Sequence, residues 1–215
     1  MPYAVSKTIK IDKIPVIDVS KLRSGTPETA LAVALKIRQA AEDVGFFYIS
    51  NHGIPEVVIK QAYSAAKSFF NLPKKLKDSV KINDNHHGYL SVGEAKMEQA
   101  EKIDLKESFV WGLDLPDEHP SVTKENPFLG RNQWPDEMPE LKGAVYPFFD
   151  AGLQCGRDMM RAFALGMELA EDSFLKSTDE PIARSSIIHY PPQPADLGVE
   201  QFGVAPHTDY GCLTL

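Results

Sequence analysis

The N-terminal part of the chain alternates between short apolar runs of strand length and amphipathic stretches with helical spacing. Residues 14–18 (Ile-Pro-Val-Ile-Asp) and 46–50 (Phe-Phe-Tyr-Ile-Ser) are rich in β-branched and aromatic side chains, which predicts strands. Between them, apolar side chains recur every three or four residues over 26–45, which predicts a helix that opens at a Thr-Pro pair and ends at a glycine. A second amphipathic helix is expected over 55–73, with a proline at each end.

The middle of the chain has a weaker pattern. Residues 81–93 show no hydrophobic period and predict a loop, whereas 106–113 form an apolar run that predicts a strand. Residues 116–139 contain five prolines and predict an excursion over the protein surface.

A long helix is expected over 139–175, where apolar residues again recur at helical spacing. Pro147 lies inside this stretch and predicts a kink or a break in its first half. Two further apolar runs, 183–190 and 210–215, predict strands. The pattern thus predicts both helices and strands along the chain.

Composition narrows the class of protein. The chain has 215 residues, a net charge of −7 and 43% hydrophobic residues, values that argue against a disordered chain. The acidic balance argues against a nucleic-acid partner, and the basic run 74–77 is interpreted as a solvated helix face. No stretch predicts a membrane span. Cys155 and Cys212 are expected to remain unbridged, and Cys155 to be an inert core thiol, as in a cytoplasmic protein.

The best metal signal is the triplet His207-Thr208-Asp209. On an extended segment residues i and i+2 point to the same side, so an imidazole and a carboxylate could share one ion. Two histidines and one carboxylate with open positions are typical of non-haem Fe(II) sites. By itself the triplet is a weak signal, since a turn histidine followed by a capping aspartate gives the same pattern. His52 is interpreted as structural and the pair 86–87 as exposed loop histidines.

Four blocks of the sequence, in order, carry a family resemblance. They are Ile14-Pro15-Val16-Ile17-Asp18, Gly45-Phe46-Phe47-Tyr48-Ile49-Ser50-Asn51-His52-Gly53-Ile54, His189-Tyr190-Pro191-Pro192 and Pro206-His207-Thr208-Asp209-Tyr210-Gly211-Cys212-Leu213-Thr214-Leu215. With these blocks the chain resembles the isopenicillin N synthase-like branch of the Fe(II)- and 2-oxoglutarate-dependent oxygenases. Because the blocks span nearly the whole chain, chance is a poor explanation for all four.

The resemblance implies a fold and a division of the chain. The fold class would be α+β, and the core would be a distorted double-stranded β-helix, or jelly roll, present in part here and preceded by a helical N-terminal region. Residues 1–120 would form the N-terminal region, 121–180 the proline-rich excursion and long helix, and 181–215 the start of the oxygenase core. The 46–53 block would be structural, with largely buried aromatic side chains and Gly53 in a turn.

The resemblance also implies a site and a chemistry. His207 and Asp209 would be catalytic as ligands of Fe(II), and Tyr190 would line the pocket for 2-oxoglutarate or substrate. O₂ would be the second co-substrate, and the reaction would be hydroxylation, desaturation or cyclisation at a C–H bond of a small molecule. In the family a second histidine and an Arg-x-Ser motif lie downstream, so we expect these 215 residues to be part of a longer polypeptide. The substrate and the oligomeric state stay open.

Three alternatives remain open from the sequence. The chain could be an inactive binding or scaffold protein that retains the fold, or an oxidase of the same fold that uses O₂ without 2-oxoglutarate. A metal-dependent hydrolase or isomerase on a similar barrel is the third alternative, but no general acid or base stands out near His207.

Overall fold

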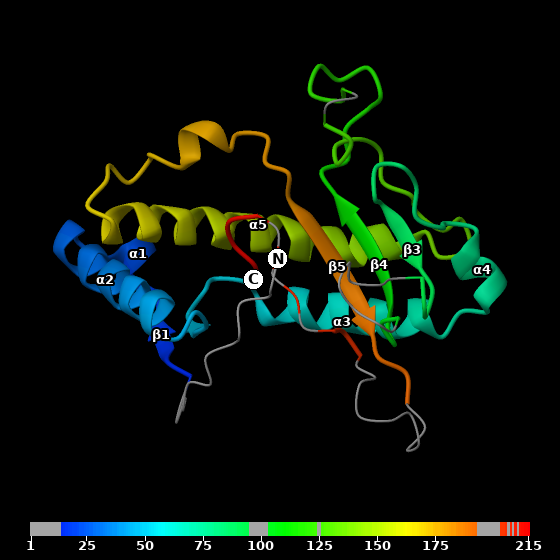
Figure 1. The fold of residues 1–215 in the computed structure, drawn as a ribbon, viewed down its shortest axis with the longest axis horizontal. Helices are drawn as coiled ribbons and strands as arrows, with labels where there is room; N and C mark the ends of the chain where they lie inside the picture. The colour runs from blue at the N-terminus through cyan, green and yellow to red at the C-terminus, as the bar shows by residue number, and fades with distance from the viewer. Residues whose placement is uncertain are drawn as a thin grey trace, which may run out of the picture. The chain divides into compact units, whose positions relative to one another are not determined.

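The structure is a computed structural model with mixed helices and small sheets (Figure 1), which confirms the α+β class. It describes residues 14–94, 103–123, 126–192, 203–205, 207, 209 and 211–215. By its contacts the chain divides into two units, 1–53 with 154–179, and 54–153 with 180–215. The division into 1–120, 121–180 and 181–215 stays a prediction. No helix among the described residues has the length and hydrophobicity that a membrane span requires.

The first unit is built on a parallel strand pair. Strand β1 (Val16–Asp18) pairs in register with β2 (Tyr48–Ser50). Helices α1 (Lys21–Ser24) and α2 (Pro27–Asp43) connect the two strands. The side chain of Thr26 accepts a hydrogen bond from the Thr29 N–H and caps α2, as the Thr-Pro pair predicted. The short 3₁₀ helix η1 (Leu175–Ser177) belongs to the same unit.

The aromatic block at β2 differs from the prediction. Phe46 is 74% exposed and Tyr48 is 61% exposed, so the expected burial is wrong for these two side chains, whereas Phe47 between them is half-buried. For Tyr48, alternation along the strand explains the exposure: Tyr48 lies opposite Val16 on the outer face of the pair, whereas Ile17 on the other face is buried. Gly53 does lie where the backbone turns, at φ +77°.

Gly53 provides a test of this turn. A Cβ at Gly53 would collide with the guanidinium of Arg23, which forms an ion pair with Asp158. Gly45, at φ +83°, has open space around it and is a matched control. Both alanine variants should lose about 1–2 kcal/mol for the left-handed backbone, and Gly53→Ala should lose more because Arg23 must move. Urea midpoints measure the difference, and equal midpoints would contradict the packing described here.

The second unit holds a three-stranded antiparallel sheet in the order β3-β4-β5. The strands are β3 (Gly88–Leu90), β4 (Glu107–Gly112) and β5 (Arg184–His189). Helices α3 (Glu56–Phe70) and α4 (Lys74–Asp78) precede the sheet. Helix α5 (Glu140–Gly166) begins in this unit, and in Figure 1 the strands β4 and β5 cross in front of α3 and of this first part of α5.

An aromatic core lies between the sheet and these helices. Phe109 and Trp111 are two positions apart in β4 and share one of its faces. The Phe69 ring of α3 lies 4.8 Å from the Phe109 ring. Helix α5 adds a buried stripe of residues four apart: Leu141, Val145 and Phe149. Packing on this face favours the register of β4 against β5, because a shift by one residue would turn Phe109 and Trp111 away from the aromatic core.

Helix α5 is a single helix through Pro147, so the predicted break does not occur, and the helix ends at Gly166 rather than near 175. Pro147 is exposed, so water can reach the carbonyl group whose hydrogen bond it removes, while the buried stripe continues on the opposite side.

Three other expectations from the pattern were wrong in detail. The predicted loop 81–93 contains β3, because Tyr89 is held in the ladder opposite Phe109. The proline-rich excursion returns to the core through Leu129 and Met138, which are buried. Residues 211–215 form no strand, since none of the described residues forms a ladder with them.

Candidate functional site

The predicted metal triplet lies in the second unit, after β5. His207 and Asp209 converge as expected: His207 Nε2 is 3.0 Å from Asp209 Oδ1, and both side chains remain accessible to solvent. The Oγ1 atom of Thr214 donates to the second oxygen of Asp209 at 2.9 Å and so orients the carboxylate. Thr208, between the two, is outside the described residues.

The other imidazole nitrogen of His207 faces a backbone carbonyl group. Nδ1 is 2.8 Å from the carbonyl oxygen of Ala205. A carbonyl and a carboxylate can both only accept, so each ring nitrogen of His207 faces an acceptor; when a metal ion takes the Nε2 lone pair, the hydrogen stays on Nδ1 and points to Ala205. Two electron-rich atoms at 3.0 Å are held favourably by a positive charge between them, which can be a proton or a metal ion.

The donor set fits a divalent ion. Two ligands at about 2.1 Å from one ion and at right angles to each other lie about 3.0 Å apart, which is the separation of Nε2 and Oδ1. Imidazole and carboxylate are the ligand types of non-haem Fe(II) sites. Within the described part of the chain, no group of three or more metal-ligating side chains gathers, so the pair supplies two ligands.

Tyr190, predicted to line the co-substrate pocket, follows directly on the last residue of β5 and is about half exposed. Its neighbour His189 points toward the core side of the sheet and contacts Glu107 through Nδ1, at 2.8 Å from Oε1. The backbone before Tyr190 is therefore anchored, while the role of its phenol stays a prediction.

Glu107 is the centre of a buried polar cluster that the sequence did not predict. Its Oε2 accepts from Lys77 Nζ at 2.7 Å and from the Tyr89 hydroxyl at 2.5 Å, and its Oε1 contacts His189. Burial raises the pKa of the Glu107 carboxyl, but the hydrogen bonds from these three partners outweigh it and the net pKa is lowered. Alternation with Phe109 and Trp111 was the available signal, because it places Glu107 on the same face of β4 as these two core residues.

The cluster predicts a dependence of stability on pH. Because the folded-state pKa of Glu107 lies below its unfolded value of about 4.3, its ionisation stabilises the fold above that pH. This contribution should disappear as the pH falls through the folded-state pKa. The difference in free energy of unfolding between wild type and Glu107→Gln should therefore shrink below pH ~4.3, as measured by urea unfolding. A difference that stays constant into acid would contradict the assignment.

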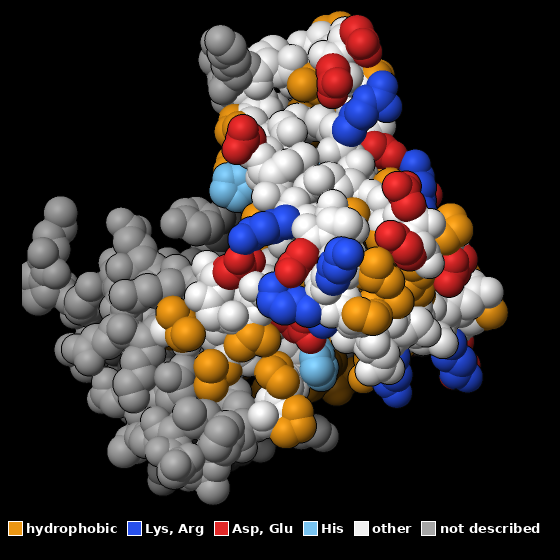
Figure 2. Space-filling model, turned by 90° about the vertical axis from the view of Figure 1, so that its right-hand side faces the viewer, with side chains coloured by type: hydrophobic (Ala, Val, Ile, Leu, Met, Phe, Trp, Pro, Cys, Tyr) orange, Lys and Arg blue, Asp and Glu red, His pale blue; other side chains and the backbone are white. Residues whose placement is uncertain are grey.

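Two sequence interpretations need correction here. Lys77 is buried against Glu107, so the 74–77 run is not a solvated face throughout; only its other members, such as Lys74, which pairs with Asp78, remain at the surface. Figure 2 shows basic and acidic side chains interspersed on this side of the molecule. His87 is fully buried rather than exposed, because its Nδ1 faces the Arg131 carbonyl and the ring fills the space beside Gly112; burial lowers its pKa.

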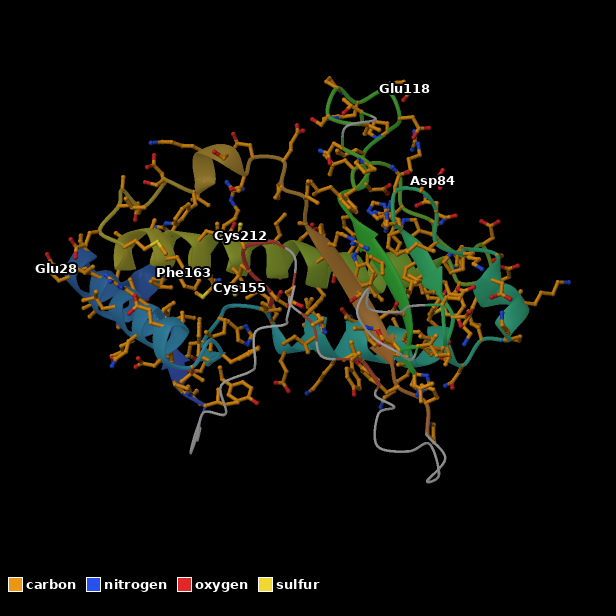
Figure 3. The ribbon with its side chains drawn as sticks, in the orientation of Figure 1. Glu28, Asp84, Glu118, Cys155, Phe163 and Cys212 are labelled. Atoms are coloured by element: carbon orange, nitrogen blue, oxygen red, sulfur yellow. The ribbon has the colours of Figure 1, made fainter. Side chains whose placement is uncertain are left out.

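Both cysteines are free thiols, as predicted. Cys155 extends from α5 (Figure 3) and is buried, which raises the pKa of its thiol and agrees with an inert core residue. Cys212 is exposed in the segment that follows Asp209.

Comparison with known proteins decides the family. Residues 14–137 match the family described as the N-terminal region of the non-haem dioxygenase in morphine synthesis. A 2-oxoglutarate-dependent dioxygenase of Didymella fabae is 32% identical over the whole of this chain and 67% of its own length. The chain belongs to this non-haem dioxygenase family. The resemblance to Fe(II)- and 2-oxoglutarate-dependent oxygenases is thereby confirmed.

One solved structure and a second sequence relative extend this comparison. A full-length Neurospora crassa protein, solved in complex with α-KG and thymine, has a TM-score of 0.75 at 26% identity, covering 92% of this chain and 62% of its own. A 2-oxoglutarate-Fe(II) type oxidoreductase of Aspergillus fumigatus is 28% identical over 94% of this chain and 61% of its own length. The non-haem dioxygenase chain described here thus spans about three fifths to two thirds of the length of these relatives.

Proposed function

We propose that the chain carries two of the three iron ligands of an Fe(II)- and 2-oxoglutarate-dependent oxygenase that acts on a C–H bond of a small molecule. The observation that carries the proposal is the geometry of His207 and Asp209, whose ligand atoms lie 3.0 Å apart while the second ring nitrogen of His207 faces the carbonyl of Ala205. The family match supports it, as do the names of the relatives, which include 2-oxoglutarate-dependent dioxygenases and 2-oxoglutarate-Fe(II) oxidoreductases.

Each residue has a distinct part in this proposal. His207 offers Nε2 as a neutral ligand, and Asp209 offers Oδ1 together with the negative charge that favours a divalent ion. Tyr190 lines the pocket for 2-oxoglutarate or substrate. Iron, when bound, supplies open coordination positions for 2-oxoglutarate and O₂. The protein contributes orientation of the ligands, and the reaction would be hydroxylation, desaturation or cyclisation.

The finer fold is part of the same proposal. Strand β5 would begin a distorted double-stranded β-helix, with His207 and Asp209 following it. The antiparallel β3-β4-β5 sheet, with one face buried on an aromatic core, supports this because jelly rolls are built from antiparallel strands. A cytoplasmic location stays a prediction.

The test is co-substrate turnover by the protein as its gene encodes it. With Fe(II) loaded anaerobically, we expect it to bind one iron and, on addition of O₂, to convert 2-oxoglutarate to succinate slowly even without its substrate. Uptake of O₂ that does not depend on 2-oxoglutarate would favour the oxidase alternative. Binding of neither iron nor 2-oxoglutarate would favour the scaffold alternative and overturn the proposal.

A further inference from the structure

Asp104 is a buried carboxylate that the proposed chemistry does not use. Its side chain is 1% exposed, and it lies three residues before β4, in the second unit. Its Oδ1 accepts a hydrogen bond from the backbone N–H of Ala205 at 3.0 Å, across 101 residues of sequence. Its Oδ2 lies 3.3 Å from the ammonium of Lys106, which is itself largely buried.

The partner of Asp104 is the residue that holds His207. Ala205 donates its N–H to Asp104, and its carbonyl oxygen lies 2.8 Å from Nδ1 of His207. Ala205 also precedes a proline in the sequence, which restricts it to extended conformations. Ala205 therefore links the buried carboxylate of Asp104 to the imidazole ring of His207, and this ring in turn faces Asp209.

The cost of burying the Asp104 carboxylate argues that its hydrogen bond to Ala205 does more than fill space in the core. A buried carboxylate is costly unless its charge is paired and its oxygens accept hydrogen bonds. Glu107 meets this condition with contacts from three side chains. Asp104 has one ion pair and one backbone donor, and that donor comes from a segment distant in sequence.

We propose that Asp104 is a positioning residue for metal binding: by holding the backbone of Ala205 it sets the tautomer and orientation of His207. The inference rests on the proposed function of His207 as an iron ligand. Loss of the hydrogen-bonding partner that orients a histidine ligand typically weakens metal binding 10–100-fold. Asp104 acts one step further away, through the residue that is this partner.

The experiment compares Asp104→Ala with Asp104→Asn, which keeps an acceptor oxygen, and with a matched control. The control is Asp114→Ala: Asp114 also accepts a backbone N–H, from Asn132 at 3.0 Å, and also pairs with a lysine, Lys142 at 2.7 Å. The readouts are Co(II) affinity at fixed pH, and the His207 tautomer in metal-free protein from ¹⁵N-histidine NMR.

We expect Asp104→Ala to weaken Co(II) binding about 10-fold, the lower end of the range for a direct partner, and to lower the share of the Nδ1–H tautomer of His207. Asp104→Asn should restore both, and Asp114→Ala should change neither, although it loses stability. Should Asp104→Ala fail to fold, Ala205→Pro removes the same hydrogen bond from the donor side and should give the same two changes.

Unchanged tautomer and affinity in a folded variant that lacks the bond would overturn the inference. So would an equal loss in Asp114→Ala, because the effect would then be general destabilisation. Failure of the proposed function looks different: wild type would bind no Co(II), while the tautomer of His207 would still respond to Asp104→Ala.

Discussion

In the protein as its gene encodes it, His207→Ala should abolish both iron binding and turnover of 2-oxoglutarate. Asp209→Ala should have the same effect. Each change removes one ligand directly, so the loss of metal affinity should exceed the roughly 100-fold that follows from losing a ligand's hydrogen-bond partner. The geometry offers no substitute, because among the described residues no third metal-ligating side chain joins this pair. Anaerobic Fe(II) titration measures affinity, and succinate formation measures turnover.

The matched control for these variants is His52→Ala. His52 lies in the turn that follows β2, in the other unit, and was interpreted as structural. Its replacement should leave iron affinity unchanged, apart from any effect on stability. If His52→Ala abolished iron binding while the fold survived, or if either site variant kept wild-type affinity, the assignment of the metal pair would be wrong.

The elements with a strong hydrophobic period could be predicted from the sequence. Helix α2 begins and ends at its predicted signals, and β4 and β5 lie within the predicted runs. Strand β3 could not be predicted, because its three residues are held by pairing with β4 rather than by a local pattern. The exposure of Tyr48 in β2 could not be predicted either, since composition gives no information on which face of a strand is covered.

The candidate site also has one part that the sequence could predict and one part that it could not. His207 and Asp209 are two positions apart, so their convergence depends only on the local backbone conformation. Their spacing was therefore sufficient to predict it. The contacts of Asp104 with Ala205 and of Glu107 with His189 join positions 101 and 82 residues apart. No periodicity reports such pairs, although the buried face of β4 identifies Glu107 as an acidic residue that needs partners.

Glu107→Ala should be the most destabilising of the changes considered, at about 3–5 kcal/mol. The reason is Lys77, whose ammonium is as buried as the carboxylate it contacts and would be left without a counter-charge. Tyr89 and His189 would each lose a hydrogen-bond acceptor as well. The free energy of unfolding from urea titration at neutral pH measures the loss.

The double variant Glu107→Leu with Lys77→Met separates the two parts of that cost. Removing both charges replaces a buried ion pair with apolar side chains, which is often neutral or stabilising when the volume is kept. We therefore expect the double variant to be more stable than either single variant, with a large interaction energy in the cycle. Additive losses would mean that Lys77 and Glu107 are solvated independently, which contradicts their 2.7 Å contact in the core of the second unit.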